Sequence, residues 1–111
     1  MLQLDELRLA VDDMSGELKD LAEAIGLSKI AEEIQALEKK SAEPDFWNNM
    51  EISHKILQKI SALKGKQQRY LRLISLYEDT KVLLDLAGEL QDESLLEEID
   101  SGVRAIQSEI E

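Results

Sequence analysis

The sequence predicts an all-α protein: an antiparallel helical bundle or coiled coil of about four helices, one of them long. Three observations carry this prediction. The 111 residues include one Pro and five Gly, fewer turn residues than a globular β or α/β domain normally needs. Leu, Ile, Glu, Lys, Ala and Gln dominate the remainder, as they do in long helices packed side by side. Apolar residues also recur at alternating steps of three and four.

A first helix is predicted to end at Ile25, because one apolar stripe runs through it for three heptads: Leu4, Leu7, Val11, Met14, Leu18, Leu21 and Ile25. Gly26 is placed to end this helix in a left-handed C-cap. Ser28 can cap a second helix, whose apolar stripe is Ile30, Ile34 and Leu37. Pro44 then enforces a break, because the residue before a proline is pushed out of the α region.

A long third helix is predicted from Asn49 to Leu90, roughly 60 Å if it is unbroken. If Asn48 is its N-cap, Glu51 completes a capping box; Gly65 is where the helix could bend. One heptad seam contains Ile56, Ile60, Leu63, Tyr70, Ile74, Tyr77 and Leu84. A second contains Leu73, Leu76, Leu83, Ala87 and Leu90. A helix with two seams touches two neighbours, so the first and fourth helices are expected to pack against the third.

The fourth helix is predicted to be capped by Asp92, with an apolar stripe of Leu96, Ile99, Val103, Ile106 and Ile110. The stripe is still running at Glu111, so the chain reads as a fragment cut inside a helix. Apolar surface is therefore expected to be exposed between Ile106 and Ile110. Such a surface predicts a weak homodimer of the isolated fragment.

Catalytic and metal-binding patterns are missing from the sequence. The chain has no Cys, which excludes a disulfide scaffold, a thiolate metal site and a Cys nucleophile, and which suits the reducing cytoplasm. His54 is the only histidine, so no pair of His ligands exists. Neither a secretory signal nor an apolar run long enough to span a membrane is present. These observations predict a non-enzymatic, soluble protein without a metal, a cofactor or a small-molecule ligand.

The charge distribution is uneven. The net charge of −11 argues against binding to nucleic acid. Between Ile52 and Tyr77, however, there is no Asp or Glu, and there are six cations. Four of these fall within about 80° of one another on a helical wheel, namely Lys55, Lys59, Lys66 and Arg69. This basic stripe either matches acidic flanks of the first and fourth helices, or forms a surface patch that meets RNA or an acidic protein.

Two of the four aromatic residues, Phe46 and Trp47, are adjacent at the junction before the third helix. One interpretation is that they plug the end of the bundle, as apolar residues preceding a helix often do. The other is that they anchor a partner, because Trp is enriched at binding hot spots. The sequence leaves both interpretations open.

The same junction carries a family resemblance. The Pro-Asp-Phe-Trp-Asn-Asn sequence of residues 44–49, followed by a Lys-rich helix, resembles the first domain of bacterial peptide chain release factor 2. Residues 76–87, Leu-Tyr-Glu-Asp-Thr-Lys-Val-Leu-Leu-Asp-Leu-Ala, and the acidic break between Glu89 and Glu93 also resemble that domain. The resemblance covers essentially the whole chain, and the Asp-Phe-Trp junction is its most specific part. Met50 departs from it, since the family often has Pro there.

The resemblance implies that residues 1–111 are a single helical N-terminal domain, ending before the codon-reading and hydrolysis domains. The family's Ser-Pro-Phe motif is absent, because the only proline is Pro44, which Asp follows. The family's Gly-Gly-Gln motif is absent as well. The implied role is docking on the bacterial ribosome, at the protein and rRNA of the large-subunit stalk base. Lys55, Lys59, Lys66, Arg69, Phe46 and Trp47 are the expected partner-binding residues. The alternative function is a structural coiled-coil or self-association domain without a ribosome role.

Overall fold

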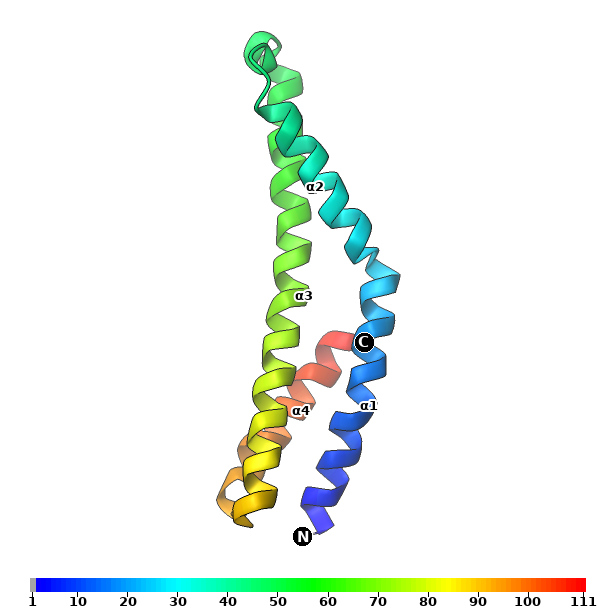
Figure 1. Ribbon diagram of the computed structural model, residues 1–111, viewed down its shortest axis with the longest axis vertical. Coiled ribbons are helices and arrows are strands. Elements are labelled where there is room, and N and C mark those ends of the chain that lie inside the picture. The colour runs from blue at the N-terminus through cyan, green and yellow to red at the C-terminus, as the bar shows by residue number, and fades with distance from the viewer. Residues whose placement is uncertain (1) are drawn as a thin grey trace. The chain divides into compact units, whose positions relative to one another are not determined.

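The computed structural model describes residues 2–111, and within them all regular structure is helical (Figure 1). The α-helices are α1 (Leu2–Ile25), α2 (Leu27–Ser41), α3 (Met50–Leu90) and α4 (Leu96–Ile110). Two short 3-10 helices precede α3 and α4, η1 (Phe46–Asn48) and η2 (Glu93–Leu95). The predicted all-α fold with about four helices, one of them long, is confirmed. No helix within residues 2–111 combines the length and the apolar character that a membrane span requires.

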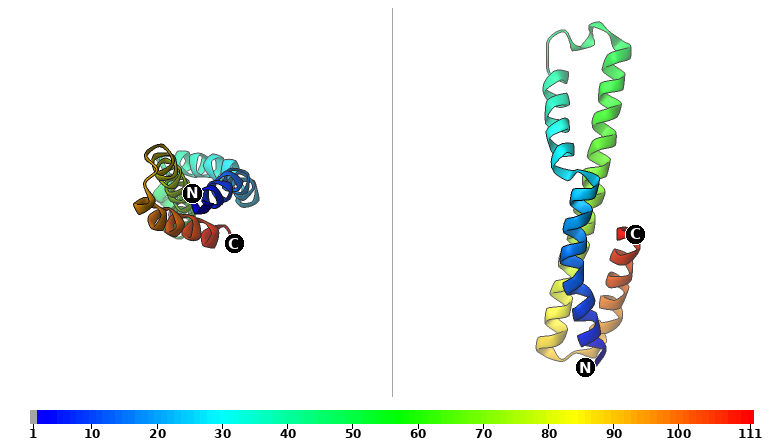
Figure 2. Two further views of the ribbon diagram at one scale, coloured as in Figure 1. Left: turned by 90° about the horizontal axis from the view of Figure 1, so that it is seen from below. Right: turned by 90° about the vertical axis from the view of Figure 1, so that its right-hand side faces the viewer.

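The chain divides into two compact units, which are described separately. The three-helix unit consists of Met1–Ala22 and Leu71–Glu111, and so contains most of α1, the second half of α3, and α4. The hairpin unit consists of Glu23–Tyr70 and contains α2, η1 and the first half of α3. In Figures 1 and 2, α3 runs antiparallel to α1 and α4 in the first unit and antiparallel to α2 in the second.

The core of the three-helix unit is built from the predicted stripes of three helices. Buried residues come from α1 (Leu4, Leu7, Val11, Met14, Leu18), α3 (Leu73, Leu84, Ala87) and α4 (Leu96, Ile99, Val103, Ile106). Met14, Leu84, Ile99 and Ile106 are the most deeply buried large side chains. The prediction that the first and fourth helices pack with the third is confirmed in this unit. Leu90 of the predicted second seam is an exception: it is the last residue of α3 and is 67% exposed.

The junction between α1 and α2 is a single residue. Gly26 adopts the left-handed conformation with φ of 70°, which favours glycine, and so ends α1 as predicted. The prediction that Ser28 caps α2 is wrong. Helix α2 begins at Leu27, directly after Gly26, and the Gly26 carbonyl already accepts a hydrogen bond from Ile30 N–H at 2.9 Å. Ser28 therefore lies inside the first turn, where its side chain is not the cap.

Helix α3 is capped by Asn49. Its side-chain oxygen accepts a hydrogen bond from the backbone N–H of Ile52 at 3.2 Å, which satisfies one of the free donors of the first turn. The Asn48–Glu51 capping box does not form, because Asn48 belongs to η1 and the helix starts one residue later than that pairing requires. The helix is 41 residues long and continues through Gly65 without a break, although Gly65 is the position where the sequence allows a bend.

The turn from α3 to α4 closes around Asp92. Gln91 adopts a left-handed conformation with φ of 50°, and Asp92 N–H donates to the Ala87 carbonyl at 3.1 Å. The Asp92 carboxylate accepts hydrogen bonds from the Ser94 hydroxyl and from the Ser94 backbone N–H, which lower the pKa of Asp92 below its ordinary value of 3.8. Asp92 therefore caps η2, and α4 follows from Leu96 without a side-chain cap of its own.

The last turns of α4 are covered from within the chain. Ile106 is 0% exposed, and Ile110 is half-buried and packs against the core of the three-helix unit. The prediction of exposed apolar surface between Ile106 and Ile110 is wrong, because α4 turns this stripe toward α1 and α3. The reason for expecting a dimer through that end is removed with it.

Candidate partner-binding surface

The hairpin unit positions the predicted surface by packing α2 on the first half of α3. Ile30 and Ile34 of α2 and Leu63 of α3 form a buried cluster, against which Leu37 packs. Ile60 of α3 is also buried. The apolar stripe predicted for the second helix is therefore the face that contacts α3, and the opposite face of α3 stays open to solvent.

Two ion pairs join α3 to α2. Lys59 Nζ lies 2.8 Å from Glu33 Oε1, and Lys64 Nζ lies 2.9 Å from Glu38 Oε1. At 3.6 residues per turn, Lys59 and Lys64 lie about 140° apart around α3, with Ile60 and Leu63 between them. The two pairs therefore lie on either side of the apolar contact. Each is partly exposed and adds about 0–1 kcal/mol to stability.

These pairs divide the predicted basic stripe. The interpretation that the stripe matches acidic flanks of the first and fourth helices is wrong for Lys59, whose partner Glu33 is on α2. Lys55 lies 3.7 Å from Glu51 on its own helix, with both side chains more than 70% exposed. Lys66 and Arg69 form no ion pair within residues 2–111, and both are exposed. Lys66 and Arg69 therefore form the part of the stripe whose charge is not neutralised inside the chain.

Phe46 and Trp47 lie in η1, at the turn between α2 and α3. Their ring centroids are 5.0 Å apart and their planes meet at 78°, the edge-to-face arrangement that aromatic pairs favour. Phe46 is half-buried, whereas Trp47 is 53% exposed. The Phe46 side chain therefore packs within the turn, whereas the large amphipathic side chain of Trp47 is exposed to solvent.

A buried serine secures this turn. The Ser53 side chain is fully buried, and its hydroxyl donates to the Asn49 carbonyl at 2.9 Å and to the Phe46 carbonyl. It thereby ties η1 to the first turn of α3 and sets the position of Phe46 and Trp47. The sequence analysis did not single out Ser53. Its place three residues before Ile56 and seven before Ile60, on the buried seam, was the signal that could have found it.

The net charge differs between the two units. The hairpin unit contains eight Lys and Arg residues against seven Asp and Glu, a net charge of +1. The three-helix unit contains five Lys and Arg against seventeen Asp and Glu, a net charge of −12. The three-helix unit would repel phosphate groups, whereas the hairpin unit carries no net negative charge that would repel them.

The remaining titratable groups form no reactive cluster within the part of the chain that the structure describes. His54, the only histidine, is exposed on α3. Residues 2–111 contain no grouping of three His, Asp or Glu side chains that could hold a metal ion. The exposed cations and the exposed Trp47 of the hairpin unit remain the candidate groups for contact with a partner.

In the described residues, the hairpin unit thus combines an exposed basic face with an exposed Trp at its turn. No known protein-family model matches the chain. In sequence it is similar to peptide chain release factor 2 of several bacteria. The identity is 26% over 110 residues for Exiguobacterium sp., 24% over 105 residues for Petrotoga mobilis, and 29% over 110 residues for Streptomyces avermitilis. These matches cover 99%, 95% and 93% of this chain.

The predicted resemblance to bacterial peptide chain release factor 2 is thus confirmed across nearly the whole chain. The chain spans 28–30% of the length of these curated relatives. The similarity therefore concerns one part of a longer factor.

Proposed function

We propose that this chain is the ribosome-docking domain of a class I translation termination factor. Residues 1–111 act as a single helical N-terminal domain that works in the cytoplasm. The domain is not itself an enzyme: the codon-reading and peptide-releasing motifs of the factor lie outside these residues. The similarity to release factor 2 over nearly the whole chain is the observation that carries the proposal.

The partner is the stalk base of the large ribosomal subunit, which offers both protein and rRNA. The exposed cations Lys66 and Arg69 support an RNA-facing role, because each Lys or Arg that meets a phosphate releases condensed counterions. Trp47 supports an anchor beside them, because a Trp this exposed gains most from burial against a partner. Lys55 belongs to the same face, while Lys59 contributes mainly to the contact with α2.

The alternative function is a structural coiled-coil or self-association domain without a ribosome role. The similarity to release factor 2 over nearly the whole chain favours the ribosome-docking function.

Charge reversal at two pairs of cations tests the proposal. The double variant Lys66→Glu/Arg69→Glu is expected to weaken binding of the chain to large ribosomal subunits by about tenfold. The slope of the logarithm of the binding constant against the logarithm of the salt concentration should become shallower by about two. Its melting temperature should stay unchanged, because neither cation has an internal ion-pair partner. Fluorescence anisotropy of the labelled chain, titrated with subunits at several salt concentrations, measures both quantities.

The matched control is Lys59→Glu/Lys64→Glu, which changes the net charge by the same amount. It should lower the melting temperature, because it sets like charges beside Glu33 and Glu38. It should weaken binding less than the first variant. Adding Glu33→Lys and Glu38→Lys should restore the melting temperature by recreating both pairs in reverse. Equal weakening by the two double variants would show that only total charge matters, and would contradict a defined docking face.

A further inference from the structure

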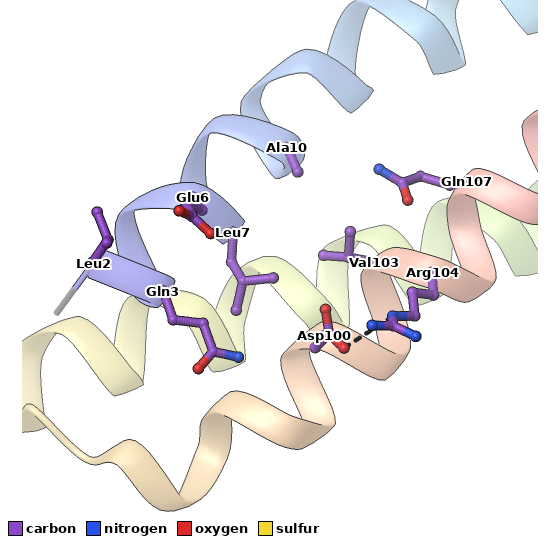
Figure 3. Close-up of a pocket in the computed structure, with 9 residues that line it drawn as sticks. All are labelled: Leu2, Gln3, Glu6, Leu7, Ala10, Asp100, Val103, Arg104 and Gln107. Carbon is purple, nitrogen blue, oxygen red and sulfur yellow. Dashed lines mark ion pairs between the residues drawn. The ribbon is translucent and has the colours of Figure 1, made fainter.

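A groove runs along the three-helix unit between α1 and α4 (Figure 3). Its volume is about 650 Å³. Leu7 of α1 and Val103 of α4 form its base; both belong to the core and are less than 10% exposed. Ala10 adds a small side chain to the α1 wall and leaves room above it. The groove therefore has an apolar base that the chain itself leaves open along one side.

The lining residues repeat with helical spacing on both walls. On α1 the groove is lined by positions 2, 3, 6, 7 and 10, and on α4 by positions 100, 103, 104 and 107. Without Leu2, the positions of α1 form an i, i+3, i+4, i+7 series, as do the four positions of α4; this is the row that one face of a helix presents to a neighbour. Seven residues span about 10 Å at 1.5 Å per residue. Two such rows are the walls between which another helix packs, as in a four-helix bundle.

The rims select the charge of that helix. Glu6 stands on the α1 side and Asp100 on the α4 side. Arg104 is the only cation in the lining, and its Nε lies 3.0 Å from Asp100 Oδ2. Helix α4 holds four acidic residues against this one Arg, and the whole unit has a net charge of −12. A polyanion is repelled by this net charge, whereas Lys or Arg beside an apolar row is attracted by it and by Glu6, since Asp100 is already paired with Arg104.

We propose that the α1–α4 groove binds an amphipathic helix of a partner protein, with an apolar row seated on Leu7, Ala10 and Val103 and with Lys or Arg on its flanks. The surface is separate in sequence and in charge from the basic face of the hairpin unit. It gives the chain a second interaction, with a cationic protein segment, in addition to ribosome docking. Glu6 and the net negative charge of the three-helix unit select a cationic partner, and the apolar row adds contacts with the base of the groove.

Titration with a synthetic Leu/Lys helix of about four turns, with Leu at i, i+4, i+7 and i+11, tests the groove in the full 111-residue chain. Amide chemical shifts are expected to move at Ala10, Val103 and Gln107. The affinity should fall about tenfold in Glu6→Lys/Asp100→Lys. The control Asp12→Lys/Glu109→Lys carries the same charge change outside the lining and should stay within about twofold of the parent chain.

The milder pair Glu6→Gln/Asp100→Asn should weaken binding in the same direction, and thermal melts identify any variant that has lost its fold. A second synthetic helix with the same Leu row but with Glu in place of every Lys serves as the control ligand. Four results would overturn the proposal: absence of binding, chemical-shift changes spread over all acidic faces, equal loss of affinity in both Lys variants, or equal binding of this Leu/Glu helix. Self-association of the chain that is lost in Glu6→Lys/Asp100→Lys would place a second copy in the groove and would also overturn it.

Discussion

Replacing Ile99 by Ala is expected to reduce the free energy of unfolding by about 2–5 kcal/mol. Ile99 is 0% exposed and lies in the core that α1, α3 and α4 share. The substitution removes buried methyl groups and leaves a cavity that three helices would have to move to fill. Urea denaturation followed by circular dichroism measures the loss.

The matched control is Ile52→Ala, since Ile52 is 52% exposed on α3. That change should stay within about 0.5 kcal/mol of the parent chain. Similar losses at positions 52 and 99 would mean that the stripe of α4 is not buried as the structure has it.

Gly102→Ala is the second substitution with a large expected effect, because α3 and α4 lie close together there. A Cβ at Gly102 would lie 2.5 Å from Thr80 Oγ1, 3.3 Å from its Cγ2 and 3.4 Å from its Cβ. Thr80 is 3% exposed, and its hydroxyl donates to the Leu76 carbonyl at 2.8 Å, so it has little freedom to move. Overpacking of this kind costs about 1–3 kcal/mol, of which the higher helix propensity of Ala offsets up to about 1 kcal/mol.

Two further variants test whether the contact with Thr80 causes the loss of stability. Gly16→Ala should stabilise the chain by up to about 1 kcal/mol, because an added Cβ there meets nothing within 4 Å. Adding Thr80→Ala to Gly102→Ala should recover part of the loss, since it removes the two closest atoms. A Gly102→Ala chain as stable as the Gly16→Ala chain would contradict the close contact between α3 and α4.

The helices were predictable because their signals are local. The alternating stripe of Leu4 to Leu18 and that of Leu96 to Ile106 both face the core, and Gly26 ends α1 as its conformational freedom suggests. The predictions that Ser28 and Asn48 are caps were wrong for a shared reason: a cap depends on where the first turn closes. The true cap positions, Gly26 and Asn49, lie two residues and one residue away.

Contacts between distant residues were not predictable from these patterns. Periodicity places Thr80 and Gly102 on their helices, but not opposite one another. The helical wheel groups Lys59 with Lys55, Lys66 and Arg69, but its partner Glu33 depends on how α2 returns along α3. Ser53 was overlooked because a serine in an apolar seam reads as an interruption, whereas here its hydroxyl satisfies carbonyls of the turn.

Docking through the hairpin turn and the basic face is the central claim, and site-specific photo-cross-linking tests it most directly. The photoreactive residue p-benzoylphenylalanine is placed at Trp47, which is 53% exposed, and separately at Leu9, which is 68% exposed in the three-helix unit. Irradiation with intact bacterial ribosomes should link position 47 to protein or rRNA of the large-subunit stalk base, and should leave position 9 without links there. Links from position 47 to the small subunit, or equal links from both positions, would contradict the docking surface.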